Sequence, residues 1–165
     1  MPGISKKKLN NTFGERDALL DPVNLRLLAA LHADPRISMT QLAKQVSMSA
    51  PAVTERVQRM QRTGIIVGFH MDVDPAALGM PVTALVRIKP GPAQLPKLIE
   101  AVQKMPQVTE CHRITGEDCL FVKVHVPSIA RLDETLDQFL LYGQTTTSII
   151  QSTPVPPRPL PVTHD

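Results

Sequence analysis

The chain is 165 residues long and 42% hydrophobic, but it holds only four Phe, one Tyr and no Trp. Scarce aromatics argue against the stacking platforms that bind single-stranded nucleic acid, and they leave the core to aliphatic side chains and Met. Residues 1–66 carry ten Lys/Arg and five Asp/Glu whereas residues 67–165 carry eight and ten, which favours a polyanion-binding module joined to a second module.

Signals for secretion, disulfide pairing and membrane insertion are missing from the sequence. The two cysteines, Cys111 and Cys119, make no disulfide framework, and no secretory signal opens the chain. No apolar run approaches the roughly 18 residues that a membrane span needs. We therefore expect a cytoplasmic protein with no membrane partner.

The chain opens with a polar segment that contains the basic run Lys6–Lys8. We expect residues 1–17 to form a flexible arm, solvated but able to contact DNA backbone without sequence preference. A first helix then begins after Asp21, a favourable N-cap, with Pro22 at its first position. Asn24 stands where a capping box has a polar side chain, and Asp34 and Pro35 end the helix. Its expected buried stripe is Leu27, Leu28 and Leu31.

Two further helices, Thr40–Val46 and Ala50–Arg62, are separated by a tight Ser-Met-Ser corner. Ser49 can cap the second of them, and Pro51 lies in its first turn, where a missing N–H costs nothing. Gly64 supplies a stop. The sequence thus predicts a helix-turn-helix domain over residues 18–66.

The helix at residues 50–62 has one apolar stripe, made by Val53, Val57 and Met60, and one polar outward face. Small polar groups framed by arginines suit a DNA major groove, although an ordinary amphipathic helix with a solvated face has the same spacing. The expected base-edge contacts are Pro51, Thr54, Glu55 and Gln58. The expected phosphate contacts are Lys44, Arg56, Arg59 and Arg62, and Ser49 completes the predicted DNA-binding set.

Residues 65–73 alternate roughly between apolar and polar and predict a short strand or wing. Turn residues from Asp74 to Pro81 then mark a boundary, so we assign residues 67–80 to a strand and linker. Residues 81–153 show the order β-α-β-β-α-β. The predicted strands are 82–89, 108–115, 120–126 and 145–152, and the predicted helices are 95–105 and 128–143. The fold class is therefore α+β, a helix-turn-helix (winged-helix-like) domain followed by a ferredoxin-like βαββαβ domain.

A four-stranded sheet with both helices on one face leaves its other face uncovered. The candidates for that face look apolar enough to meet a second copy; they are Thr83, Leu85, Thr109, Cys111, Phe121 and Ile150. We expect a homodimer through the sheets. The tail, residues 154–165, holds five of the sixteen prolines and should be extended and poorly ordered.

These features occur together, in order, over residues 18–152. The residues that carry the pattern in the first module are Leu20, Asp21, Leu27, Leu28, 34–36, Leu42, Ala43, Ser49, Val53, Arg56, Val57, Arg59, Met60, 64–66 and Gly68. In the second they are Asp74, Pro75, Leu78, Gly79, Val108 and 115–118. The chain resembles the leucine-responsive regulator/AsnC (Lrp/AsnC, feast/famine) family of prokaryotic transcription factors.

The resemblance implies a DNA-binding transcriptional regulator whose second domain binds an amino acid or a similar small metabolite, and dimers that assemble into tetramers or octamers. It places the effector near the glycine turn between the middle strands, here Thr115, Gly116, Glu117, Asp118 and Cys119, with Thr145 and Thr147 as further candidates. Three positions depart from the family pattern. Asn24 replaces Asp, Ser47 replaces a corner glycine, and Cys119 stands where many members carry an Asp that would contact an amino group.

The same residues admit other functions. Cys111, His112, Cys119 and His125 lie on two neighbouring predicted strands, which leaves a metal- or thiol-responsive regulator as an alternative, but their spacing matches no metal motif. No nucleophile set or phosphate-binding glycine loop is present, so we expect no catalytic residues, no metal and no cofactor. A nucleoid-organising protein of low sequence specificity remains the other alternative.

Overall fold

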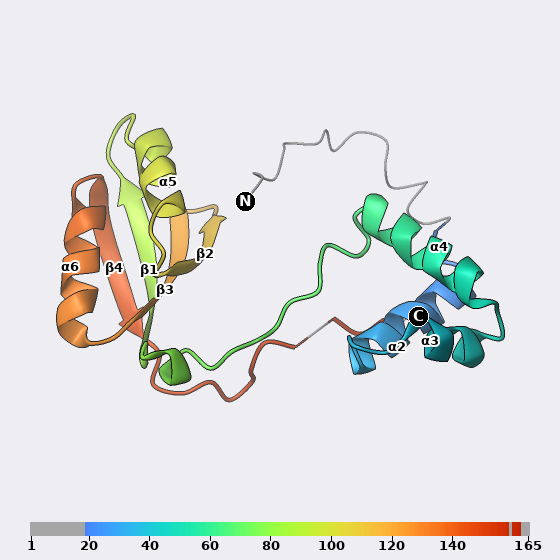
Figure 1. Cartoon of the computed structure of the whole chain (residues 1–165). Coiled ribbons are helices and arrows are strands. Elements are labelled where there is room, and N and C mark those ends of the chain that lie inside the picture. Colours follow the sequence, from blue (N-terminus) through green and yellow to red (C-terminus); the bar gives the residue numbers. More distant parts are fainter. Residues whose placement is uncertain (1–18, 159, 163–165) are drawn as a thin grey trace. The chain divides into compact units, whose positions relative to one another are not determined.

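The computed structural model describes residues 19–158 and 160–162, which fall into two units (Figure 1). The described residues up to Met71 and those from Pro157 onward form the first unit, which we call the head. Residues 72–156 form the second, which we call the sheet domain. Among the described residues, no helix is both long and apolar enough to cross a membrane.

The head consists of three helices, α2 (Pro22–Ala33), α3 (Met39–Val46) and α4 (Ala50–Arg62). Each helix begins after a side chain that accepts a hydrogen bond from a free backbone N–H, as capping requires. Asp21 caps α2 and Ser49 caps α4, as predicted. Ser38 and Gln41 form a reciprocal capping box at the start of α3, which begins one residue before the predicted Thr40.

The helix-turn-helix corner is closed by Ser47, which adopts a left-handed conformation with φ 55°. Its backbone N–H donates to the carbonyls of Ala43 and Lys44. Glycine is favoured in this conformation because it has no Cβ, so the serine forms the same turn at a small conformational cost. The predicted apolar stripe of α4 is buried in the core of the head. That core consists of Leu27, Leu31, Leu42, Ala43, Val46, Val53, Val57 and Met60, and Leu28 packs against it while partly buried.

The prediction of a strand over residues 65–73 is wrong. This segment has no regular secondary structure, and its side chains do not alternate in burial, because residues 67–73 are all exposed. Val67 and Met71 are 89% and 85% exposed. A strand needs a neighbouring strand to accept and donate its backbone hydrogen bonds, and no segment of the described chain pairs with this one.

The sheet domain begins with a short 3-10 helix, Ala76–Leu78, and has the predicted element order. Its strands are β1 (Val82–Pro90), β2 (Val108–Arg113), β3 (Leu120–Val126) and β4 (Gly143–Ile149), and its helices are α5 (Leu95–Gln103) and α6 (Ile129–Leu140). The strands form one antiparallel sheet in the order β2-β3-β1-β4, with α5 and α6 on one face (Figure 1). The ferredoxin-like prediction is confirmed.

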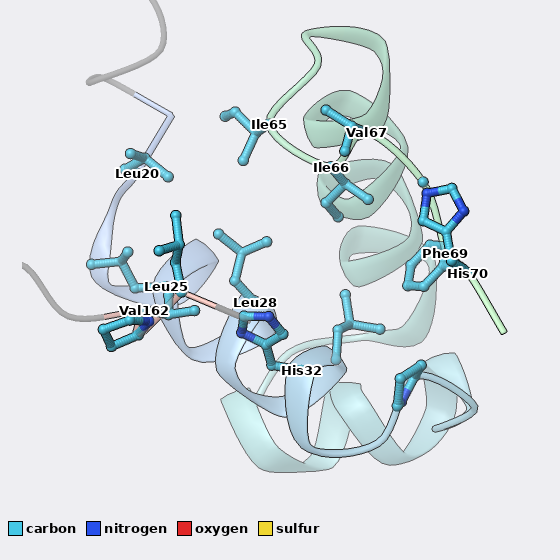
Figure 2. A pocket seen from close by; sticks show the side chains of 15 residues that line it. Leu20, Leu25, Leu28, His32, Ile65, Ile66, Val67, Phe69, His70 and Val162 are labelled. Carbon is cyan, nitrogen blue, oxygen red and sulfur yellow. The ribbon is translucent and has the colours of Figure 1, made fainter. Parts of the chain in front are cut away.

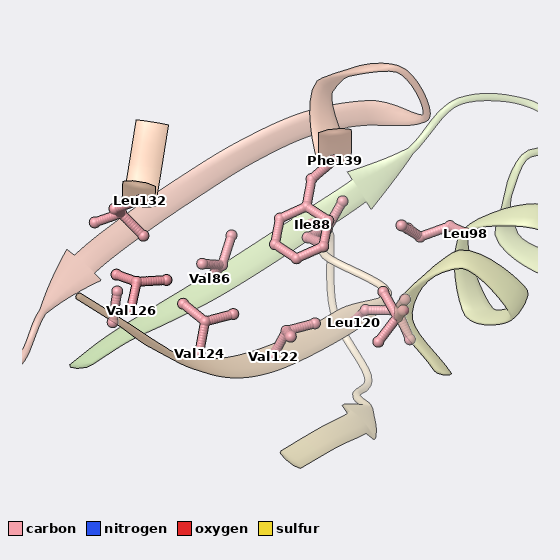
Figure 3. Packing of buried hydrophobic residues seen from close by; sticks show 11 residues of the cluster. Val86, Ile88, Leu98, Leu120, Val122, Val124, Val126, Leu132 and Phe139 are labelled. Carbon is pink, nitrogen blue, oxygen red and sulfur yellow. The ribbon is translucent and has the colours of Figure 1, made fainter. Parts of the chain in front are cut away.

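The core of the sheet domain lies between this sheet and the two helices (Figure 3). Alternate residues of β1 and β3 are completely or almost completely buried there, as expected for a sheet covered on one side. They pack against α5 and α6; the residues concerned are Ala84, Val86, Ile88, Leu98, Val102, Leu120, Val122, Val124, Val126, Leu132 and Phe139. Gly143, predicted to end α6, instead begins β4.

A β-bulge reverses part of the predicted side-chain pattern on β2. Val108 lies opposite Val124, but Glu110 lies opposite Lys123, so Thr109 is an extra residue in the ladder. From there on Cys111 faces Val122, on the helix-covered side. The prediction that Cys111 lies on the open face is therefore wrong, because one extra residue moves every later side chain to the other side.

Candidate DNA-binding and effector sites

The outward face of α4 is exposed along its whole length. Pro51, Glu55, Gln58, Arg59 and Arg62 all face solvent. Within the described residues, no carboxylate lies at ion-pair distance from Arg59 or Arg62. Two guanidinium groups and several hydrogen-bonding groups are thus available to a polyanionic partner.

Other members of the predicted DNA-binding set surround this face. Lys44, on α3, and Ser49, at the start of α4, are exposed. Ser49 accepts the Ala52 N–H at 3.4 Å, so its oxygen also serves as the helix cap. Thr54 is half-buried, and its hydroxyl donates to the Ala50 carbonyl at 2.9 Å. The Thr54 hydroxyl proton is therefore already used within the helix, which leaves its oxygen as an acceptor.

Arg56 differs from the other arginines of the set because its guanidinium is bound inside the head. Its Nη1 donates to Oδ2 of Asp21 at 2.7 Å and to Oδ1 of Asn24 at 3.0 Å. Desolvation by itself would raise the pKa of Asp21, but the hydrogen bonds from Arg56 and from the Asn24 N–H, with the Arg56 charge, hold that pKa below its ordinary value. The structure thus gives Arg56 a partner other than phosphate.

The predicted effector turn joins β2 and β3 and is pinned at both sides. The Ile114 N–H donates to the Cys119 carbonyl at 3.1 Å, and the Cys119 N–H donates to the Ile88 carbonyl at 3.0 Å. Gly116, at φ +111°, takes a conformation that L side chains rarely adopt. The N–H groups of residues 115–118 donate to no other backbone group of the described chain. They are free to bind a carboxylate.

Arg87 of β1 reaches this turn, and sequence reasoning missed it. Its Nη1 lies 3.6 Å from Oδ2 of Asp118. The pair places a guanidinium and a carboxylate beside the free amides, which matches the two charges of an amino acid. A lone arginine among the apolar residues of a predicted strand was the signal available for Arg87.

Thr145 and Thr147 are not brought to the turn within one chain. They lie opposite Ile88 and Val86, on the helix-covered side of the sheet. Their strand, β4, is at the edge of the sheet, separated from β2 by β1 and β3.

The cysteine-based alternative gains no geometric support. Cys111 faces Val122, whereas Cys119 precedes Leu120, which lies opposite Arg113, so the two thiols are on different rungs of the ladder. Among the described residues, no three His, Cys, Asp or Glu side chains gather as metal ligands would. The Cys111 residue is exposed, although partial desolvation raises the pKa of its thiol, so its environment is not the electropositive one that activates a thiol.

Two of the cavities formed by the described residues lie in the head. An apolar one of about 450 Å³ is bounded by α2, by the segment after α4 and by Leu160, Pro161 and Val162 of the tail. Figure 2 shows Val162 on the side of Leu25, away from Phe69. The second, of about 590 Å³, lies along the flank of α4 beside Arg56 and Arg59.

Comparison with known proteins gives matches in both units. A family model described as winged helix-turn-helix DNA-binding matches residues 20–67, and one described as Lrp/AsnC ligand binding domain matches residues 83–160. The HTH-type transcriptional regulator LrpC of Bacillus subtilis is 32% identical over 81% of this chain and 92% of that protein. The leucine-responsive regulatory protein of Escherichia coli is 31% identical over 74% of this chain and 76% of that protein. The solved structure of E. coli AsnC has a TM-score of 0.75, 30% identity, and covers 83% of this chain and 95% of that chain.

Proposed function

Because the chain belongs to the Lrp/AsnC family of transcriptional regulators, we propose that α4 enters the DNA major groove and that the sheet domain binds an amino acid that controls this binding. The observation that carries the proposal is the exposed face of α4, which presents Glu55 and Gln58 together with Arg59 and Arg62, two arginines with no carboxylate at ion-pair distance among the described residues. Arginines in the last turn of a helix also interact favourably with its dipole, but their exposure beside hydrogen-bonding side chains is what suits them to DNA phosphates.

The effector site is proposed at the turn of residues 115–118. The free N–H groups and Arg87 supply donors for a carboxylate, and Asp118 or Glu117 supplies an acceptor for an α-ammonium. The name of the leucine-responsive relative supports an amino acid as the ligand class. Cys119 offers no anionic contact, so Asp118 takes that role in this chain.

Dimerisation through the open face of the sheet, and assembly of dimers into tetramers or octamers, complete the proposal. A two-fold pair of heads would bind a pseudo-palindromic site whose half-sites are one or more helical turns apart. Effector binding would favour one assembly over another and so change the spacing of the heads.

The test has two parts that use the full chain. Binding sites are selected from random duplex DNA, and affinity for the selected site is measured by fluorescence anisotropy at several salt concentrations. A panel of amino acids is then screened for a thermal shift and for a change in assembly size by light scattering. Equal affinity for all sequences would overturn the specific-regulator proposal, and a panel without any effect would overturn the effector proposal.

A further inference from the structure

The start of α2 and the middle of α4 are joined by three polar side chains, Asp21, Asn24 and Arg56, which we call the clamp. Nη1 of Arg56 donates to both of the others, at 2.7 and 3.0 Å. Nδ2 of Asn24 donates to the Leu19 carbonyl at 2.6 Å, and Oδ1 of Asp21 accepts the Asn24 N–H at 2.7 Å. The clamp therefore connects α4, the cap of α2 and the chain that enters α2.

Burial makes these bonds costly to break. Asn24 is only 3% exposed, and each polar group of its side chain has a partner. Removing the partner of a buried polar group leaves that group desolvated and unpaired. An aspartate in place of Asn24 would accept from Arg56 but could not donate to Leu19, so the amide found here suits both partners.

Arg56 also lies on the wrong side of α4 to enter a groove of DNA. It is three residues after Val53 and four before Met60, both of which are completely buried. The cavity beside it is lined by Asp21 and Asn24 as well as by Glu55 and Arg59. Apolar packing is thus interrupted on this flank of α4, and the clamp is the polar link between the two helices there.

We propose that Arg56 and Asn24 are positioning residues that set the orientation of α4 for DNA, and that Arg56 itself does not contact phosphate. The proposal rests on the proposed DNA-binding function of α4. It predicts that Arg56 governs affinity without contributing to the salt dependence of binding, because that dependence counts only the charges that displace counterions from DNA.

The experiment compares Arg56→Gln with the matched change Arg59→Gln, in full-length protein, by anisotropy titration of selected DNA across salt concentrations. We expect Arg59→Gln to reduce the slope of log affinity against log salt by about 0.9. Arg56→Gln should weaken binding about tenfold at every salt concentration and leave the slope unchanged. Titration at stoichiometric concentrations should give an unchanged binding-competent fraction, a readout that simple unfolding would lower.

Asp21→Asn provides a second variant, because it removes the charge that holds Arg56 but keeps a side chain that can cap α2. It should weaken binding in the same way, and the double variant should bind no more weakly than Arg56→Gln alone. A slope reduced by Arg56→Gln, additive losses in the double variant, or a loss confined to the competent fraction would each overturn the proposal. Failure of the unaltered protein to bind any DNA would instead overturn the proposed function on which it rests.

Discussion

The head and the sheet domain expose their functional groups in different ways. In the head, the buried polar group Asn24 is bonded within the unit, and the predicted contact surface is one face of α4 with Lys44 of α3 beside it. In the sheet domain, helices cover one face only. The other face carries cross-strand pairs, with Thr83 Oγ1 2.9 Å from Nδ1 of His125 and Lys123 Nζ 2.9 Å from Glu110.

A single chain therefore forms the proposed DNA-contacting surface of the head by itself, whereas its sheet domain leaves one face uncovered. The proposed DNA-contacting face of α4 is formed by that helix and oriented by the clamp. The proposed effector site combines the turn of residues 115–118 with Arg87 of the neighbouring strand β1. On the open face of the sheet, the half-buried Leu85 and Phe121 lie among polar pairs, where a second copy would bind. Substitutions in each unit should therefore have separable consequences.

The largest expected effect comes from a substitution that creates a cavity in the core of one unit. Phe139→Ala should lower the free energy of unfolding of the sheet domain by about 3–5 kcal/mol, because a fully buried ring leaves a cavity. Leu27→Ala is the matched change in the head, with an expected loss of about 2–5 kcal/mol. Differential scanning calorimetry should show a different transition shifted by each. A single transition lowered by both substitutions would contradict the independence of the two units.

A second large effect is expected where β4 begins. A Cβ on Gly143 would lie 2.2 Å from the Lys89 carbonyl oxygen, so Gly143→Ala forces β1 and β4 apart and should cost about 1–3 kcal/mol or more. Gly91→Ala is the control, since a Cβ there meets its nearest atoms at 3.7 Å. Urea unfolding followed by circular dichroism compares them, and equal stability of the two variants would refute this account.

Local signals made the head more predictable than the sheet domain. The bounds of α4 follow from a serine cap, an early proline and a stripe of 3.6-residue period, all read within thirteen residues. The face of Cys111, by contrast, depends on the bulge at Thr109, which appears only in the pairing of β2 with β3. Local patterns therefore determine elements better than they determine register.

The candidate sites show the same division. The exposed arginines of α4 could be predicted from their helical angle, but the partner of Arg56 lies 35 residues away in the chain. Arg87 meets Asp118 only because β1 and β3 are neighbours in the sheet. Both contacts are products of tertiary packing, which a single sequence does not encode at any fixed spacing.

A smaller difference between the two units is expected in how their stability depends on pH. Desolvation, and then the nearby Lys123 charge, lowers the pKa of His125, although Glu110 acts in the opposite direction. The unfolded chain then takes up a proton more readily than the folded one, so the sheet domain should lose stability as pH falls below about 6.5. In the head the lowered pKa of Asp21 makes stability fall only below about pH 4.

Urea unfolding at pH 7.5 and 5.5 gives the free energy of unfolding of each unit and so measures this difference. His125→Asn keeps a hydrogen-bonding atom near Thr83 without a titrating ring, so it should reduce the pH dependence of the sheet domain and leave that of the head unchanged. A pH dependence that survives the substitution would assign the effect to other groups.

The smallest effect concerns the tail. The half-buried Val162 lines the apolar cavity of the head, together with Leu25 and Leu28 of α2. Val162→Asp places a charge beside these leucines and should lower the free energy of unfolding of the head by up to about 1 kcal/mol. Val155→Asp, at a position 62% exposed and outside the cavity lining, should leave it unchanged. Equal melting temperatures for the two variants would mean that the tail adds nothing to the head. A selective loss in Val162→Asp would mean that the tail after β4 stabilises the head.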